Sequence, residues 1–192
     1  YNVQEGTNPG FLYQQNTMRD AMIAGATLNI LHNHARRVKM ANLAQAINVL
    51  QAVILTDEEK MLLTPTYHVM KMYNVHQDAT LLPIDLSNVT YAHNGEQLPA
   101  FSASASQDST GAIHISLVNI HASEAQEVDI SLLGTENAEV SGTILTSGNL
   151  QDHNTFESPE AIVTEEFDDF RKKKEQMTVN IPPFSVVVLE VK

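Results

Sequence analysis

The sequence predicts an α+β fold in which helical segments come before an all-β, jelly-roll-like sandwich. Apolar residues recur at helical spacing in two segments ahead of residue 76, whereas the residues beyond 80 alternate between apolar and polar in short runs. Glycine, proline and asparagine separate these runs, and many short strands joined by such turns are typical of a sandwich. We therefore expect two units, one over residues 1–78 and the other over residues 79–192.

Composition excludes several classes of function. The chain has 192 residues, of which 43% are hydrophobic, so it can build a substantial core. Its formal net charge of -12 opposes binding to the phosphate backbone of nucleic acids. There is no cysteine for a disulfide or a thiolate metal site, and no apolar run of about 18 residues, the length that spans a bilayer. We expect no nucleic acid, membrane, metal or cofactor to bind.

A first helix is expected from about residue 14 to residue 35. Thr17 can cap its N-terminus, and Asp20 three residues later can complete a capping box. The helix should end near His34, where we expect His32 and His34 to interact with the helix dipole rather than with a metal, since residues two apart point to different sides. Its apolar side is predicted to hold Met18, Met22, Ile23, Ala26, Ile30 and Leu31.

The segment from Arg36 to Gln51 sets side-chain amides in an apolar background. The amides recur at every third position, at Asn42, Gln45, Asn48 and Gln51, and the apolar residues between them fit one helix face. A helix would turn the amides toward solvent as a polar stripe. The alternative is a short buried strand, residues 38–44, that delivers Gln45 at its C-terminal end. Periodicity over so short a segment is compatible with both structures.

A charged loop and a second helix are expected next. Residues 56–64, TDEEKMLLT, are predicted to be a loop, and Thr64 followed by Pro65 predicts a helix start. This helix should run to about residue 75 and use Tyr67, Met70 and either Met72 or Tyr73 for packing. Because His68 and His76 have no third ligand in reach along the sequence, we expect no metal there.

Short strands are expected throughout the second unit. The predicted runs are VTYAH from Val89, FSASAS from Phe101, AIHISLVNI from Ala112, EVDISLL from Glu127, EVSGTILT from Glu139, MTVNI from Met177 and SVVVLEV from Ser185. In AIHISLVNI, Ile113, Ile115 and Leu117 share one side and His114 takes the other. This pattern predicts that His114 lies on the surface.

Acidic residues gather in the longest irregular stretch, residues 148–169. Glu165, Glu166, Asp168 and Asp169 are close together, but they lack the alternating Asp/Asn ligands and the glycine of a calcium-binding loop. We therefore expect a solvated acidic loop without calcium.

Several long motifs occur in the order found in one enzyme family. These motifs are NTMRDAMIAGATLNILHNHA, RVKMANLAQAINVLQAVILT, TPTYHVMKMYNVHQ, SASASQDSTGAIHISLVNI, SGTILTSGNLQDHNTFESP and PPFSVVVLEV. Together they span essentially the whole chain. On these motifs the chain resembles the C-terminal part of the α-L-arabinofuranosidases of glycoside hydrolase family 51.

The resemblance implies a (β/α)8 barrel with a β-sandwich packed beside it. Residues 1–78 would be the last part of the catalytic barrel, which favours the strand interpretation of residues 38–44 in the intact enzyme. Gln45 would then hydrogen-bond the arabinofuranosyl ring next to the scissile bond, at the end of the barrel where such enzymes build their sites. We expect Asn42 and Asn48 to support nearby backbone, and the loop around Asn154 to fold back on the barrel.

Family members hydrolyse glycosides with retention, using two glutamates. Both belong to motifs upstream of Tyr1, so the resemblance implies that this chain holds no catalytic residue. We interpret Glu5 as a solvated loop residue, because a lone carboxylate lacks the partner that divides acid and nucleophile roles. The parent protein would release terminal non-reducing α-L-arabinofuranosyl residues from arabinan or arabinoxylan. It is also expected to be a homo-oligomer, and the chain alone to be inactive.

A second hypothesis is that the sandwich is a carbohydrate-binding or oligomerisation module. Carbohydrate-binding modules usually expose a flat row of aromatic rings. This chain has no tryptophan and only 6% aromatic residues. Tyr91, Phe101 and Phe184 lie in or beside predicted strands, where packing in the core is the default expectation. The sequence therefore favours the enzyme fragment over the binding module.

Overall fold

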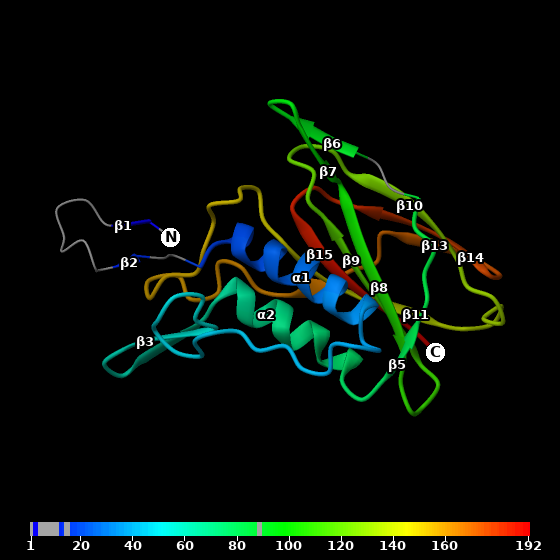
Figure 1. The fold of residues 1–192 in the computed structure, drawn as a ribbon, viewed down its shortest axis with the longest axis horizontal. Helices are drawn as coiled ribbons and strands as arrows, with labels where there is room; N and C mark the ends of the chain where they lie inside the picture. The colour runs from blue at the N-terminus through cyan, green and yellow to red at the C-terminus, as the bar shows by residue number, and fades with distance from the viewer. Residues whose placement is uncertain (1, 4–11, 14–15, 88–89) are drawn as a thin grey trace.

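The computed structural model describes residues 2–3, 12–13, 16–87 and 90–192. Glu5 lies outside these residues. The described chain is built in three layers, a helical layer, a six-stranded sheet and a three-stranded sheet (Figure 1). The mixture of helices and strands confirms the predicted fold class, with the helices first in the chain and the sandwich after them.

The two sheets are antiparallel throughout. Across the large sheet the order is β12 (Glu165–Glu166), β11 (Val140–Thr146), β15 (Ser185–Val191), β9 (Ile113–Asn119), β8 (Phe101–Gln107) and β5 (Thr80–Leu82). The small sheet contains β10 (Gln126–Ser131), β14 (Gln176–Ile181) and β13 (Phe170–Lys173). Every predicted run contains a strand of the structure, whereas three strands of these two sheets, β5, β12 and β13, were not predicted.

The sandwich core lies between the two sheets. On the large sheet, Val187 faces Leu117 across one strand pair and Leu117 faces Ala103 across the next, so alternate residues of three strands form one apolar surface. Met177 and Val179 of β14 cover this surface from the small sheet, and all five side chains are buried. The alternation of apolar and polar residues along the strands therefore predicts correctly which side chains form the sandwich core.

The opposite face of the large sheet carries the helical layer, formed by α1 (Met18–Asn33), α2 (Pro65–Met72) and the 3-10 helix η1 (Tyr73–His76). Figure 1 shows α1 lying over the long strands with α2 beside it. Both predicted caps form. The Asp20 carboxylate accepts the backbone N–H of Thr17 at 2.7 Å, and the Thr64 hydroxyl accepts the N–H of Tyr67 at 3.3 Å.

The buried face of α1 differs from the predicted one. Its buried residues are Met18, Asp20, Ala21, Met22, Gly25 and Asn29. Ile23 and Ile30, which were predicted to share the apolar side, are each 57% exposed. The large sheet therefore covers only part of the apolar surface of α1. An apolar strip of α1, which contains Ile23 and Ile30, stays exposed.

The prediction that His114 lies on the surface is wrong. Its side chain points to the opposite face of β9 from Ile113 and Ile115, as predicted, but the residue is only 4% exposed. The alternation of apolar and polar residues along β9 correctly predicts which face of the sheet His114 is on. The helical layer packs on that face and buries His114. A polar residue on the outer face of a sandwich becomes interior when a third layer packs there.

Residues 38–53 form neither of the structures considered for them. They are irregular, and the only ladder contact described for them is an isolated bridge between Ile47 and Ile54. No described strand pairs with residues 38–44, and a barrel strand takes its hydrogen bonds from neighbours on both sides. Without strand partners in the described chain, this segment is irregular and contains bends.

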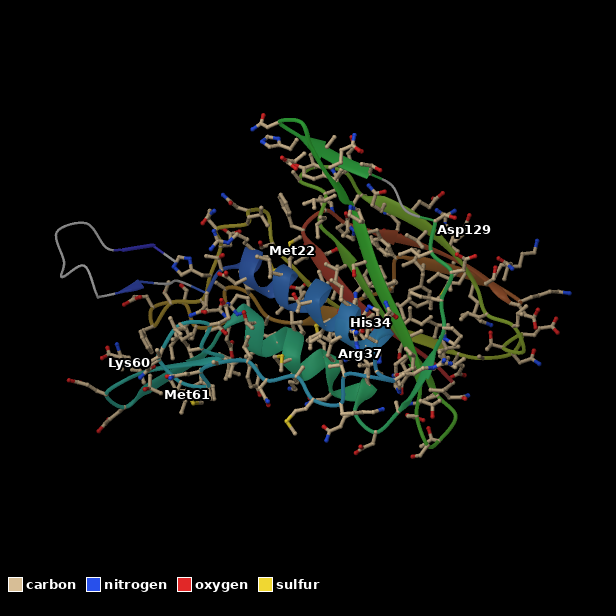
Figure 2. All side chains as sticks on the ribbon, in the orientation of Figure 1. Met22, His34, Arg37, Lys60, Met61 and Asp129 are labelled. Carbon is tan, nitrogen blue, oxygen red and sulfur yellow. The ribbon has the colours of Figure 1, made fainter. Side chains whose placement is uncertain are left out.

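The predicted loop at residues 56–64 is instead mostly a hairpin. β3 (Ile54–Asp57) pairs with β4 (Lys60–Leu63), and Glu58 in the turn has a φ of 50°. Charged residues occupy the tip of the hairpin, and this local composition favoured a loop. The residues on either side of the tip nevertheless pair as strands. Figure 2 shows Lys60 and Met61 projecting at the far end of this hairpin.

Two further strand pairs complete the described chain. β1 (Asn2–Val3) pairs with β2 (Leu12–Tyr13), and β6 (Thr90–His93) pairs with β7 (Glu96–Pro99). Asn94 and Gly95 join β6 to β7 with φ values of 49° and 85°, the left-handed pair that two-residue hairpin turns require.

The long loop after β11 folds back onto the helical layer. The carbonyls of Asp152 and Leu150 accept the first N–H groups of α1, from Met18 at 2.9 Å and Arg19 at 3.0 Å. Asn154 donates to the carbonyl of Leu63 at 2.8 Å. The sandwich loop thus satisfies groups that a helix N-terminus leaves unpaired. In the described residues, no helix has the length and hydropathy needed to cross a membrane.

Candidate functional site

Gln45 lies in the irregular segment between α1 and β3, with its side chain exposed. Within the described part of the chain, no hydrogen bond engages its amide. A cis peptide bond joins it to Ala44. The side chain is therefore free to offer both a donor and an acceptor to a ligand.

Backbone hydrogen bonds close the chain immediately after Gln45 into a compact loop. The carbonyl of Ala46 accepts the N–H groups of Val53 at 3.2 Å and Ile54 at 3.1 Å. The N–H of Asn48 donates to the carbonyl of Ile54 at 3.1 Å. The base of the hairpin thereby fixes the position of the residue that follows Gln45.

Asn48 ties the same loop to β3 through its side chain. Its Oδ1 accepts the backbone N–H of Thr56 at 2.7 Å, and its Nδ2 donates to the Thr56 hydroxyl at 2.8 Å. Its φ is 59°, a left-handed conformation that asparagine tolerates better than most residues. In this structure the side chain of Asn48 therefore supports the loop that carries Gln45.

Asn42 lies beside a pocket of about 340 Å³ between α1 and the irregular segment. Leu43, Ala44 and Gln51 also line it, together with apolar residues of α1 such as Ile23. The amide of Gln51 is turned toward α2, where it donates to the Thr66 hydroxyl at 3.2 Å. Gln45 and Asn48 are not part of this lining, so the structure does not gather the four amides into one site.

Basic residues follow the C-terminal end of α1, next to a wider groove. Figure 2 shows His34 and Arg37 at this end of the helix. With Arg36 and Lys39 they line one side of a groove of about 1190 Å³, whose other side is formed by β5, β8 and the β6–β7 hairpin. Among the described residues, neither arginine forms an ion pair.

A largely buried polar cluster, which the sequence patterns did not predict, joins the helical layer to the large sheet. We call it the histidine–serine cluster. Its members are Asn29, His32, Tyr73, His76, Ser104, Ser106, His114 and Ser116. They come from α1, η1, β8 and β9. Two strand positions of FSASAS and two of AIHISLVNI thus meet residues of both predicted helices.

His76 is at the centre of this cluster. Its Nδ1 lies 2.7 Å from the Ser106 hydroxyl and its Nε2 lies 2.6 Å from the Ser116 hydroxyl. Burial first, and then the neighbouring His32 and His114, lower the pKa of His76 to about 3. Burial also lowers the pKa of His32. These imidazoles are therefore neutral over most of the physiological range.

The Ser116–His76 contact is structural in this arrangement. A serine hydroxyl against a histidine nitrogen can be the start of a nucleophilic site. Ser116 is 0% exposed, however, and a sheet strand lies on each side of it, so no substrate can reach the hydroxyl. The contact instead supplies the hydrogen bonds that buried polar groups require.

One sequence signal could have revealed the cluster. Ser102, Ser104 and Ser106 occupy alternate positions of one strand, where a solvated face more often carries long charged side chains. Small hydroxyl residues on one face leave room for another layer and can bond to it. Such an alternation, next to predicted helices with histidines near their ends, indicates a helix docked on that face.

The aromatic residues of the sandwich pack against protein. Phe101 and Phe167 are buried in the core, and Phe170 packs beside Phe167 with ring centroids 6.2 Å apart. The ring of Tyr91 packs edge-on against His121 at 4.9 Å. These rings do not form a flat open row, so the structure gives no support to the polymer-binding hypothesis.

The chain is similar to known proteins over its whole length. It is 46% identical over 192 residues to the intracellular exo-α-L-arabinofuranosidase of Bacteroides ovatus, covering 100% of this chain and 37% of that protein. It is 35% identical over 126 residues to α-L-arabinofuranosidase 1 of Arabidopsis thaliana, covering 64% of this chain and 18% of that protein. The chain therefore spans less than two fifths of the length of these relatives.

Solved structures give the same relationship. The family 51 arabinofuranosidase of Xanthomonas axonopodis pv. citri is 43% identical, with a TM-score of 0.94 that covers 100% of this chain and 39% of that one. The α-L-arabinofuranosidase of Thermotoga maritima shares the fold, with a TM-score of 0.82 at 23% identity over 99% of this chain and 40% of that one.

A family profile covers nearly the entire sequence. The family described as the α-L-arabinofuranosidase C-terminal domain matches residues 1–185. The chain belongs to this family and corresponds to the C-terminal part of the family 51 glycoside hydrolases.

Proposed function

We propose that this chain is the C-terminal portion of a retaining exo-α-L-arabinofuranosidase. The observation that carries the proposal is the 46% identity to the Bacteroides ovatus exo-enzyme over all 192 residues. On this proposal the whole protein releases terminal non-reducing α-L-arabinofuranosyl residues from arabinan- or arabinoxylan-type oligosaccharides. The chain itself supplies part of the pocket wall and the sandwich that supports the barrel.

The proposal divides the chain into residues 1–78, the end of the catalytic barrel, and residues 79–192, the sandwich. The exposed apolar strip of α1 supports this division. Ile23 and Ile30, each 57% exposed, lie on a helix whose other side is already covered by the sheet. The remaining barrel helices and strands would cover this strip and give residues 38–44 the strand neighbours that they lack.

Gln45 is the residue that we propose to contact substrate. Its exposed amide has no partner in the described chain, and hydrogen bonds hold the loop after it. An amide can donate to one sugar hydroxyl and accept from another, which suits the ring of an arabinofuranosyl group. We propose supporting roles for Asn42, beside the pocket under α1, and for Asn48, which ties the loop to Thr56.

The catalytic chemistry is proposed to lie in the part of the barrel that precedes this chain. Retention requires one carboxylic acid to protonate the leaving oxygen and one carboxylate roughly 5 Å away to attack the anomeric carbon. From the family resemblance we propose that both glutamates lie upstream of Tyr1. The proposal therefore includes no catalytic residue in this chain, and it includes self-association of the whole protein as a homo-oligomer.

A fusion enzyme tests the proposal. It joins the part of the Bacteroides ovatus relative that precedes the matched region to this chain, and both the fusion and the chain alone are assayed on an aryl α-L-arabinofuranoside. The fusion should release the aryl group, while the chain alone should not. Turnover by the chain alone would show that one of its own carboxylates, with Glu5 the first to substitute, performs the chemistry. Sedimentation of the fusion at micromolar concentration tests the oligomer.

A further inference from the structure

Three imidazoles lie in a row across the boundary between the helical layer and the large sheet. The ring centroids of His32 on α1 and His76 on η1 are 4.6 Å apart, and those of His76 and His114 on β9 are 6.4 Å apart. His76 bonds to serines of two neighbouring strands, Ser106 and Ser116. One side chain therefore attaches η1 to both β8 and β9.

Other titratable groups surround this row unevenly. On the side of His114, Asp108 in the turn after β8 places Oδ2 at 3.0 Å from Nε2, and Glu190 on β15 is the direct cross-strand partner. On the side of His76, the neighbours are the neutral phenol of Tyr73, with its ring 5.6 Å away, and the cation of Lys39, which lines a shared pocket. Carboxylates therefore lie beside His114, whereas no described carboxylate contacts His76.

Protons can reach the cluster without unfolding of the protein. A surface pocket of about 250 Å³ is lined by both His32 and His76, together with Tyr73 and Lys39. His32 and His76 are therefore open to solvent along the edge where α1 and η1 meet, whereas His114 stays buried.

We propose that the histidine–serine cluster is an acid-sensitive joint, in which protonation of His76, assisted by His32, releases α1 and η1 from β8 and β9. Neutral His76 donates to one serine and accepts from the other, so both ring nitrogens are satisfied. The imidazolium has two donors and no acceptor, so the serine hydroxyl that donated to the neutral ring loses its acceptor there. The new charge is also partly desolvated between two other imidazoles.

The direction of the effect follows from linkage. Burial and then the flanking His32 and His114 lower the pKa of His76 to about 3 in the folded state, against 6.5 when it is exposed. Between these values the closed state binds fewer protons than the open state. The closed joint is therefore fully stable above about pH 6.5 and weakens about tenfold per pH unit as the pH falls. This inference does not depend on the proposed glycosidase activity.

The test uses His76→Gln in this chain. Glutamine can still donate to one serine and accept from the other, but it does not titrate. Amide hydrogen exchange at pH 7.5 and 4.5, corrected for intrinsic exchange rates, gives the opening constant of α1 and η1.

For the wild type we expect opening to rise about 100-fold at pH 4.5 from His76 alone, with β10 and β14 remaining protected. In His76→Gln this 100-fold contribution should be absent. His93→Gln, the same change on the exposed β6–β7 hairpin, should behave as wild type.

An equal rise in His76→Gln, or no rise in the wild type, overturns the proposal. If the His76→Gln variant fails to fold, NMR titration of the histidine side chains of the wild-type chain provides the test instead. A His76 ring that stays neutral until α1 loses protection supports the joint. A His76 ring that titrates near pH 6.5 with α1 still protected contradicts it.

Discussion

Two hydrogen bonds join Asn48 to Thr56. The backbone N–H of Thr56 donates to Oδ1 of Asn48 at 2.7 Å, and Nδ2 of Asn48 donates to the Thr56 hydroxyl at 2.8 Å. This contact fastens the loop that follows Gln45 to the first strand of the β3–β4 hairpin. The position of the proposed substrate-contacting amide therefore depends on a hairpin that local composition had suggested was a loop.

Asn48→Ala should lower the free energy of unfolding of this chain by about 1 to 2 kcal/mol. The change removes both bonds to Thr56 and leaves a left-handed φ that alanine adopts less readily. Chemical denaturation followed by circular dichroism measures the loss. Asn137→Ala is the matched control, because Asn137 is exposed in a turn and its side chain has no described hydrogen bond; it should change stability by less than about 0.5 kcal/mol. Equal effects of the two substitutions would contradict the role given to Asn48.

Gly142→Ala should destabilise the fold by about 2 kcal/mol or more, since overpacking of a close contact against backbone cannot relax freely. A Cβ at this position would lie 2.6 Å from the carbonyl oxygen of Phe167 and 3.1 Å from a methyl of Leu189. Gly148→Ala provides the control, because a Cβ there meets nothing within 4 Å. Thermal melts of the two variants should differ clearly. A Gly142→Ala protein as stable as Gly148→Ala would show that β11 and β12 are not packed as described.

Asn154→Ala should detach the long loop from the helical layer. Its amide donates to the carbonyls of Leu63 at 2.8 Å and Ile162 at 2.9 Å and accepts the N–H of Ile162 at 2.7 Å, all at a buried position. Loss of these bonds leaves buried backbone groups unpaired, and we expect a cost of about 2 to 4 kcal/mol. Proteolysis under native conditions should become faster within residues 148–164.

The comparison for Asn154 is Asn137→Ala, at an exposed turn position where no described side-chain hydrogen bond is lost. That variant should retain both stability and protease resistance. If cleavage in residues 148–164 is equally slow in the Asn154 and Asn137 variants, the loop is held by other contacts.

The helices and the central strands could be predicted because their signals are local. Thr17 with Asp20 and Thr64 with Pro65 mark helix starts through hydrogen bonds made within one turn. Alternation along residues 112–120 fixes which side chains face the sandwich core, since the side-chain period of a strand is two.

The failed predictions depended on contacts that are distant in sequence. His114 was expected on the surface because nothing in its own strand shows that η1 will pack against it. Ile23 and Ile30 were grouped with the buried face of α1 because periodicity cannot tell which neighbour occupies which side. Residues 38–44 lack the strand partners that their sequence pattern would suit.

The candidate site was predictable only in part. Family motifs pointed to Gln45, and the structure places it on an exposed loop held by Ala46 and Asn48. The support from Thr56 could not be read from the sequence, because it needs the β3–β4 hairpin to bring that residue back. Whether Gln45 touches substrate stays a prediction.

The most direct test of the account is therefore the kcat/KM of the fusion enzyme on an aryl α-L-arabinofuranoside with Gln45→Ala in its C-terminal part. Loss of one or two hydrogen bonds to the sugar should lower kcat/KM by about 5- to 150-fold, equivalent to about 1 to 3 kcal/mol of transition-state stabilisation. Gln97→Ala, at an exposed glutamine of the β6–β7 hairpin, should leave kcat/KM unchanged. A Gln45→Ala enzyme with the kcat/KM of the unaltered fusion would contradict the claim that this chain forms part of the pocket wall through Gln45.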